Sequence, residues 1–343
     1  MIDFFVREKS MTIKDIAKET GYSIGTVSRV LNNHPNVSEK ARKTIMEAVD
    51  RHGFILNVSA KNLKTVQSEN IIIVVKGTFN ELFPVMVQRI QMYFRETRYT
   101  LITEYVDEEA DEVTRARQVC LEKKAIGLLI LGGNKENFKK GFDRIKIPAV
   151  LVTNHAGDWG FENLSSVSTD DTEGARKAVE FLLENGHRNV ALLGGTVGSD
   201  TSTQRRLGWE KAQEDFGIKK EDFGPQVGGR YSFEAGYEAM KKLLKGDKKI
   251  TGVFALADVM AIGAISAISD AGLSVPEDIS VIGYDGIPIG AYFCPKLTTI
   301  RQSIDRICDR SCEILIDRLE NEGKTRHEFI PFTLDERQSV KKI

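Results

Sequence analysis

Residues 12–32 read TIKDIAKETGYSIGTVSRVLN, and their pattern predicts two short helices joined by a turn at Gly21. Thr12 and Asp15 have the spacing of a capping box, which favours a helix start. Ser23 is the expected N-cap of a second helix that runs to about Leu31. The apolar faces would consist of Ile13, Ile16 and Ala17 in the first helix and Val27, Val30 and Leu31 in the second. Glycine at the turn and apolar residues at these intervals are typical of a helix-turn-helix.

The same stretch contains a rival motif, because Gly21-Tyr22-Ser23-Ile24-Gly25 fits the G-x-S-x-G pattern of a hydrolase nucleophile elbow. An elbow needs an apolar strand before the serine, since the turn must lift the hydroxyl above a sheet. The residues before Ser23 are charged, lack two-residue alternation and predict a helix. We therefore interpret Ser23 as a helix cap. No P-loop or dinucleotide fingerprint follows a predicted strand, and we expect that the protein is not an enzyme.

A third helix is expected after Ser38 as N-cap, with its end marked by Gly53. Its inward residues would be Ile45, Ala48 and Val49. Residues 57–63, NVSAKNL, could form one more short helix, but it has too few turns to be stable alone. With the polar linker that follows, it is interpreted as a connector that orders when it docks against something.

The charges divide the chain into a basic head and an acidic body. Residues 1–64 carry 11 Lys or Arg against 7 Asp or Glu, giving +4, and the remainder of the 343 residues carries −5. This asymmetry indicates a module that binds a polyanion attached to a body that does not. The length suits two or three domains.

Composition also bounds the compartment and the chemistry. The sequence has no run of about 18 apolar residues, and its N-terminus is too polar for a secretory signal, so we expect a cytoplasmic protein without membrane contact. The four cysteines form no CxxC pair and are expected to pack in the core; they are Cys120, Cys294, Cys308 and Cys312. We expect neither a metal nor a cofactor.

From residue 71 onward, short apolar runs alternate with amphipathic stretches. The runs are residues 71–75, 128–131, 149–152, 190–193, 253–256 and 281–283. Continuous apolar strands of this kind predict parallel sheets covered on both faces. About 270 residues is large for one doubly wound sheet, so two α/β lobes are expected. Ligands in such folds collect at the carboxyl ends of strands, which points to the cleft between the lobes.

These stretches together resemble one family. Residues 12–54 resemble the DNA-binding head of LacI/GalR transcriptional regulators, and NVSAKNL resembles their hinge helix. GARKAVEFLLENGHRNVALLGG, YSFEAGYEAM, SVPEDISVIGYDGIPIG and LTTIRQ resemble that family's sensor domain, which is similar to periplasmic sugar-binding proteins. The resemblance implies an all-α helix-turn-helix head at 11–55, a hinge helix and linker at 56–69, and an α/β, two-lobed type I periplasmic-binding-protein-like sensor with parallel sheets at 70–343.

In this family the second helix lies in the major groove. The resemblance places Ile24, Gly25 and Arg29 at base edges, with Asn36 at a further base. Phosphate contacts would come from Thr26, Ser28, Asn32 and Ser38, with the cap Ser23 nearby. Arg29 alone of the three reading residues can make a bidentate contact with guanine, worth about 1–3 kcal/mol; the alternative is a phosphate or an acidic neighbour. Leu63 would wedge into the minor groove, or instead pack on the body.

The resemblance also implies an effector site between the lobes. Its residues would be Asn80, Phe83, Arg205, Tyr231 and Asp285, although Arg205 and Asp285 could instead merely pair with each other. Two positions depart from the sugar-binding pattern, with Ala257 where Asn is usual and Thr153-Asn154 where many members have Asp. We therefore expect a different mode of binding from that of simple hexoses, with Asn154, His155 or Trp159 contributing.

The expected protein is a homodimeric regulator that represses transcription. Each head would take half of a near-palindromic operator in double-stranded DNA, and a sugar or related metabolite would shift the lobes and the hinge. The last five residues, SVKKI, contain no leucine heptads for a tetramer. The alternative is a body controlled by a protein partner, as in catabolite-control members. Because the resemblance begins near Met11, translation starting there is a further hypothesis.

Overall fold

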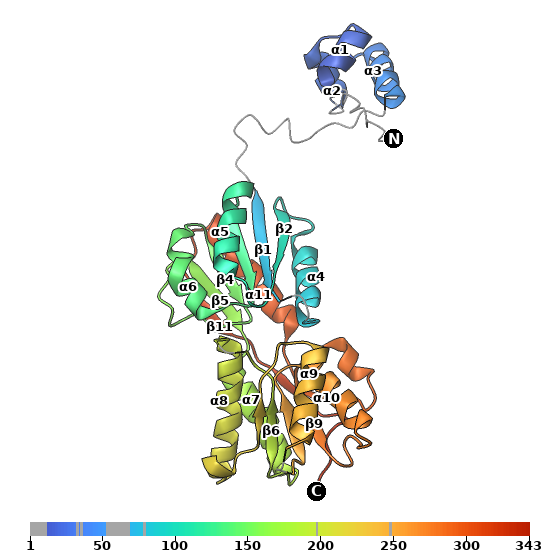
Figure 1. Ribbon diagram of the computed structural model, residues 1–343. Coiled ribbons are helices and arrows are strands. Elements are labelled where there is room, and N and C mark those ends of the chain that lie inside the picture. Colours follow the sequence, from blue (N-terminus) through green and yellow to red (C-terminus); the bar gives the residue numbers. More distant parts are fainter. Residues whose placement is uncertain are drawn as a thin grey trace, which may run out of the picture. The chain divides into compact units, whose positions relative to one another are not determined.

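The computed structural model describes residues 12–31, 34, 37–52, 69–77, 80–196, 198–246 and 249–343. The chain divides into two compact units, Met1–Gln67 and Ser68–Ile343 (Figure 1). They are called here the head and the body. The expected hinge at 56–69 lies outside the described residues apart from Glu69.

The head contains α1 (Ile13–Thr20), α2 (Ile24–Leu31) and α3 (Glu39–Arg51). Thr12 and Asp15 form the expected capping box, with each side chain bonded to the other residue's backbone N–H. Gly21 ends α1 with φ 74°, a conformation that glycine adopts without steric cost. The helix starts and stops in this region are therefore confirmed.

The three helices of the head share one small apolar core. Ile16, Val27 and Ile45 come from α1, α2 and α3 respectively and are fully buried. The rest of this core consists of Ala17, Val30, Ala48 and Val49. Every one of these residues was expected to face inward, because helical periodicity alone defines the apolar side of each short helix.

The body contains two six-stranded sheets. The first has the order β11-β5-β4-β3-β1-β2 and is parallel throughout its described pairings. Its strands are β1 (Asn70–Lys76), β2 (Thr100–Val106), β3 (Gly127–Leu131), β4 (Ala149–Val152), β5 (Leu164–Ser168) and β11 (His327–Phe329). Its helices are α4 (Leu82–Phe94), α5 (Glu112–Lys123), α6 (Lys135–Gly141) and α11 (Ile304–Glu320), with the 3₁₀ turn η2 (Phe142–Arg144).

The second sheet has the order β12-β10-β9-β8-β6-β7, and only the β10–β12 pairing among those described is antiparallel. Its strands are β6 (Val190–Leu193), β7 (Gln226–Val227), β8 (Gly252–Ala255), β9 (Ser280–Asp285), β10 (Thr298–Arg301) and β12 (Thr333–Asp335). Its helices are α7 (Asp171–Glu184), α8 (Asp200–Asp215), α9 (Phe233–Leu244) and α10 (Asp258–Asp270), with η3 (Lys220–Asp222) and η4 (Pro288–Ala291).

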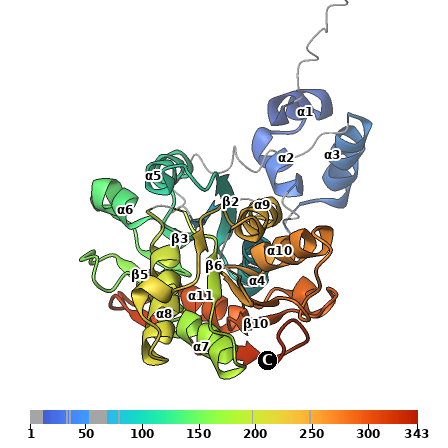
Figure 2. The ribbon, with the colours of Figure 1, turned by 60° about the horizontal axis from the view of Figure 1, so that its bottom comes forward.

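Each sheet is buried on both faces, as expected. In β1, Ile71, Ile73 and Val75 join a core that includes α4 residues, whereas Ile72 and Val74 join a core that includes α5 residues. In the second lobe, α7 lies beside α8 and α9 beside α10 in both views (Figures 1 and 2). The chain passes between the lobes after β5, after β10 and after β11, so lobe orientation is set by connecting segments.

Two expectations require correction or extension. Cys120, Cys308 and Cys312 are buried as expected, but Cys294 is exposed, because it lies in the irregular segment between η4 and β10. The sequence did not predict six of the strands, which are β2, β5, β7, β10, β11 and β12. Strand β5 contains three serines, and the others are short or half-exposed. No helix within the described ranges is long and apolar enough to cross a membrane.

Candidate functional site

Helix α2 presents one face to solvent. Ile24, Gly25 and Arg29 are exposed, and Ile24 is 47% exposed despite its apolar side chain. Val27 and Val30, on the other side of α2, are buried in the head core. The residues expected to read bases therefore share the outward face of one helix. Their contact with DNA stays a prediction.

Hydroxyl side chains lie at the N-termini of α2 and α3. The Ser23 hydroxyl accepts a hydrogen bond from the backbone N–H of Thr26 at 3.2 Å and lies 2.9 Å from the Thr26 hydroxyl. The Ser38 hydroxyl accepts from the N–H of Ala41 at 3.3 Å. Both serines are helix caps, and such helix ends favour a phosphate. Ser28 is half-buried on α2, whereas Asn32, Asn36 and Leu63 lie outside the described residues.

Helix α1 and a turn precede Ser23 in the chain. A nucleophile elbow would place an apolar strand there. The structure therefore agrees with the interpretation of Ser23 as a cap and gives the rival hydrolase motif no support.

A cavity of about 490 Å³ lies between the lobes of the body. It is lined at the carboxyl ends of β1, β3, β4 and β9, where parallel strands leave a ligand-binding edge. Six of the residues expected at an effector site line it, namely Asn80, Phe83, Asn154, Arg205, Tyr231 and Asp285. The fold thus brings together side chains that are more than 200 residues apart in sequence, although their contact with a ligand stays a prediction.

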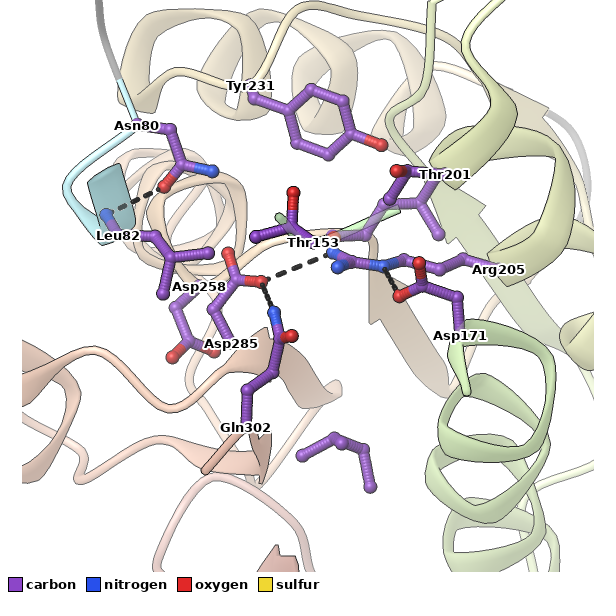
Figure 3. Close-up of polar contacts among 12 residues, drawn as sticks. Asn80, Leu82, Thr153, Asp171, Thr201, Arg205, Tyr231, Asp258, Asp285 and Gln302 are labelled. Carbon is purple, nitrogen blue, oxygen red and sulfur yellow. Dashed lines mark hydrogen bonds and ion pairs between the residues drawn. The ribbon is translucent and has the colours of Figure 1, made fainter. Parts of the chain in front are cut away.

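Arg205 is a buried residue of the cavity lining and lies between Asp171 and Asp285 (Figure 3). Its Nε donates to Asp171 at 2.8 Å, and its Nη1 lies 3.3 Å from Asp285 and 2.5 Å from the carbonyl oxygen of Leu256. Its guanidinium also stacks on the Tyr284 ring at 3.7 Å. Burial alone would lower the pKa of Arg205, but the two carboxylates raise it above its ordinary value, so the cation persists.

Only one of the two carboxylate oxygens of Asp285 has a hydrogen-bond partner among the described residues. Oδ1 accepts from Arg205 and from the amide of Gln302 at 2.9 Å. Oδ2 is buried and has no hydrogen-bond partner in the described part of the chain. In Figure 3 this oxygen is directed away from Gln302. Burial raises the pKa of Asp285 to about 6, although Arg205 opposes that shift. A buried acceptor without a partner is costly, so this oxygen favours a ligand or a water molecule that supplies the donor.

Backbone strain occurs in the same cavity wall. Thr153 has φ 79° and Asp285 has φ 118°, in a region that side-chain-bearing residues rarely adopt. Both line the cavity. Strained residues persist only where their surroundings hold them, and they concentrate at binding sites. These two positions are therefore an observation, separate from the side-chain contacts, that is consistent with a binding site at this cavity.

Asp258 fixes the segment that follows Asp285. Its Oδ2 accepts from the backbone N–H groups of Gly286 and Ile287, each at 2.8 Å, and its Oδ1 lies 2.6 Å from the Thr299 hydroxyl. Asp258 is fully buried, and burial raises its pKa to about 8. Burial favours the protonated form of this carboxyl group, whereas the donated hydrogen bonds from Thr299, Ile287 and Gly286 favour the carboxylate.

We expect Asp258→Ala to lower the free energy of unfolding by about 1–3 kcal/mol for each buried N–H left without an acceptor. Asp258→Asn is the matched control, because its amide oxygen can still accept both N–H groups while its NH₂ donates to Thr299. Its loss should be much smaller. Urea denaturation at pH 7 measures both. Equal losses in the two variants would contradict the role assigned to Asp258.

The first-lobe wall depends on Glu112, which sequence reasoning missed. This fully buried carboxylate pairs with Lys76 at 2.6 Å and accepts from the backbone N–H of Asn134 at 2.7 Å and the amide of Asn137 at 2.8 Å. Lys76, Asn134 and Asn137 all line the cavity. The Lys76 ammonium also donates to the carbonyl oxygen of Ala110. Helical periodicity gives no sign of such a buried ion pair.

Asn154 bridges the two lobes. Its Oδ1 accepts from the N–H of Gly133 at 3.1 Å, and its Nδ2 donates to the Thr201 hydroxyl at 2.9 Å. Thr201 belongs to α8 of the second lobe and also lines the cavity. Asn80 instead organises the first lobe, since its Oδ1 accepts from the N–H of Leu82 at 3.0 Å at the start of α4.

Three residues named in the sequence analysis do not line the cavity: His155, Trp159 and Ala257. His155 stacks on Phe329 with ring centroids 4.3 Å apart, and Trp159 packs against Phe138 in the first-lobe core at 4.9 Å. Of the three residues proposed to replace the missing polar partners, only Asn154 therefore faces the cavity. Ala257 is buried at the start of α10.

Comparisons with known proteins place both units. Residues 12–57 match the model of the bacterial regulatory proteins of the lacI family, and residues 164–340 match that of a periplasmic binding protein-like domain. The HTH-type transcriptional regulator MalR of Clostridium butyricum is 36% identical over 96% of this chain and 99% of its own length. The HTH-type transcriptional repressor PurR of Histophilus somni (strain 129Pt) is 32% identical over 97% of this chain and 99% of its own length.

Among solved structures, the lac repressor dimer bound to operator and the anti-inducer ONPF superposes with a TM-score of 0.77. It is 25% identical over 97% of this chain and 100% of that chain. A helix-turn-helix head on a two-lobed periplasmic-binding-protein-like body defines a DNA-binding transcriptional regulator with an effector-binding domain. The chain belongs to the LacI family of bacterial transcriptional regulators. The predicted fold class and family are thereby confirmed.

Proposed function

We propose that this regulator is a homodimeric repressor that binds a near-palindromic operator and is controlled by a sugar or related metabolite in the cavity between its lobes. The observation that carries the proposal is the cavity itself. It gathers six of the expected effector residues around a buried carboxylate oxygen that has no partner in the described part of the chain. Hydroxyl groups of a sugar-like ligand are suitable donors to that oxygen, and the aromatic Tyr231 can contact an apolar sugar face.

The DNA-binding part of the proposal rests on α2. Its outward face offers the Arg29 guanidinium for a bidentate contact with guanine and the exposed Ile24 side chain for a thymine methyl group. The capped starts of α2 and α3 would take phosphates, which fix the position of the head without reading sequence. We assign residues 11–55 to the DNA-binding domain, 56–69 to a hinge and 70–343 to the sensor and dimerisation domain.

Coupling between effector and DNA would act through lobe orientation. Contacts such as Asn154–Thr201 cross the cavity and would be altered by a ligand that occupies it. A ligand that binds one lobe arrangement more tightly shifts the population toward it, and the hinge would transmit that shift to the heads. The sign of this effect, induction or corepression, is an outcome of the experiment below.

The test is binding of the full-length protein to a randomised pool of palindromes at fixed salt, repeated with a panel of sugars and nucleosides. We expect one enriched palindrome whose binding changes with at least one panel member that also raises the melting temperature. Enrichment of an operator with a silent metabolite panel would overturn metabolite control and favour the protein-partner alternative. No enrichment at all would overturn the proposal for the head.

A single variant tests how the head reads bases. We expect Arg29→Ala to reduce discrimination between the operator and a one-base variant by about 5- to 150-fold, equivalent to about 1–3 kcal/mol. Lys43→Ala, at an exposed position of α3, should leave that ratio unchanged. Fluorescence anisotropy with paired oligonucleotides gives both ratios. If Arg29→Ala weakened every sequence equally, Arg29 would be a phosphate contact.

A further inference from the structure

We propose that the cavity accepts effectors that carry hydrogen-bond donors at both ends and no negative charge, and that Glu108 selects them as a second carboxylate acceptor across from Asp285. The inference rests on the proposed function, because it specifies the ligand of the same cavity. Glu108 follows β2 in the first lobe, whereas Asp285 ends β9 in the second. Both line the cavity.

The cations that line the cavity are already neutralised. The Lys76 ammonium lies 2.6 Å from Glu112, and Arg205 pairs with both Asp171 and Asp285. An anionic ligand would have to compete with carboxylates that are themselves buried. Breaking a buried ion pair leaves one buried charge without a partner, and the free-energy cost of that charge opposes binding of the anion. The described lining therefore has no cation ready for a phosphate or carboxylate group.

The carboxylates, in contrast, retain unused acceptors. Oδ2 of Asp285 and Oε1 of Glu108 are buried atoms without a hydrogen-bond partner among the described residues. Asp285 is only 1% exposed, so its free oxygen can be reached only from the cavity side. A ligand with hydroxyl or amino groups at two ends would satisfy both oxygens.

Arg230 favours the charged form of Glu108. The Arg230 guanidinium lies 2.6 Å from Asp107, 3.7 Å from Oε2 of Glu108 and 3.9 Å from Glu109. Burial raises the pKa of Glu108, whereas Arg230 and hydrogen bonds from the Tyr231 backbone and the Thr196 side chain oppose that shift. Because one cation faces three carboxylates, this rim of the cavity stays acidic and repels anions. Glu109 also lines the cavity and adds to the same field.

The experiment uses the full chain and four matched probes: a neutral sugar, its amino derivative, its phosphate ester and its uronic acid. Inorganic phosphate alone is a fifth probe, and all are compared at equal ionic strength by calorimetry and thermal shift. We expect saturable binding by the neutral or amino form, at least tenfold tighter than by either acidic form. Tightest binding by an acidic form, or saturable stabilisation by phosphate, would overturn the charge selection while leaving effector control intact. Absence of binding by every probe would overturn the selection proposed here, whereas effector control itself is tested by the sugar and nucleoside panel described above.

Variants of Glu108 test whether this residue is responsible for the selection against acidic ligands. We expect Glu108→Gln to weaken binding of the neutral or amino probe about tenfold, and Glu108→Lys to shift the preference toward the phosphate ester. Glu96→Gln, at an exposed position outside the cavity lining, is the matched control. If Glu108→Gln bound the neutral or amino probe as tightly as the unchanged protein, or if Glu108→Lys left the probe preference unchanged, the assignment to Glu108 would be wrong.

Discussion

Replacing Arg205 with alanine is expected to lower the free energy of unfolding of the body by about 3–5 kcal/mol, because it leaves buried carboxylates without their cation. Asp171 and Asp285 are both buried and both pair with Arg205. The substitution also removes the stacking contact with Tyr284 and the bond to the Leu256 carbonyl. The adjacent variant Arg206→Ala, at an exposed position of α8, should be nearly neutral.

The pH dependence identifies the cause of that loss. Burial already raises the pKa of Asp171 and of Asp285 above their ordinary values, and removing Arg205 should raise both further. A raised pKa means that the folded state binds more protons than the unfolded state. Stability is then greatest at low pH and falls as pH rises through the folded pKa values. The Arg205→Ala deficit should therefore shrink between pH 7 and pH 5. A deficit independent of pH would indicate lost packing instead.

Ile45→Ala in the head is expected to abolish specific DNA binding while leaving effector binding by the body intact. Ile45 of α3 is fully buried against Ile16 and Val27 in the small core that holds the three helices together. Loss of a buried isoleucine side chain costs about 2–5 kcal/mol, which is comparable to the stability of so small a core. The α2 surface would then no longer be held in one arrangement.

Hydrogen exchange followed by mass spectrometry on the full chain measures this effect, with operator binding measured in parallel. Peptides within residues 12–52 should lose protection in Ile45→Ala, whereas peptides of the body should not. Met46→Ala is the control, because Met46 is the next residue on α3 and is 38% exposed. Retained protection together with normal operator binding would show that the head core tolerates the cavity.

Local sequence patterns were sufficient wherever one element defines its own environment. Thr12, Gly21 and Ser23 mark helix ends through contacts within a few residues, so α1 and α2 could be predicted closely. Strands buried on both faces, such as β1 and β3, appear as continuous apolar runs. The strand β2 does not, because it is half-exposed, and missing β2 also hid Glu108, which follows it.

The sequence by itself determined the head, the two-lobed class of the body and, through its resemblance to a family, six residues that share one cavity. Only the tertiary structure decided which charged side chains in that cavity are already paired with each other. Arg205 pairs with Asp171 and Asp285, and Lys76 pairs with Glu112. The partners are far apart in the sequence, so no local pattern predicts these ion pairs. Ion pairing and burial depend on distances in space, so the unpaired oxygens of Asp285 and Glu108 became visible only once the chain was folded.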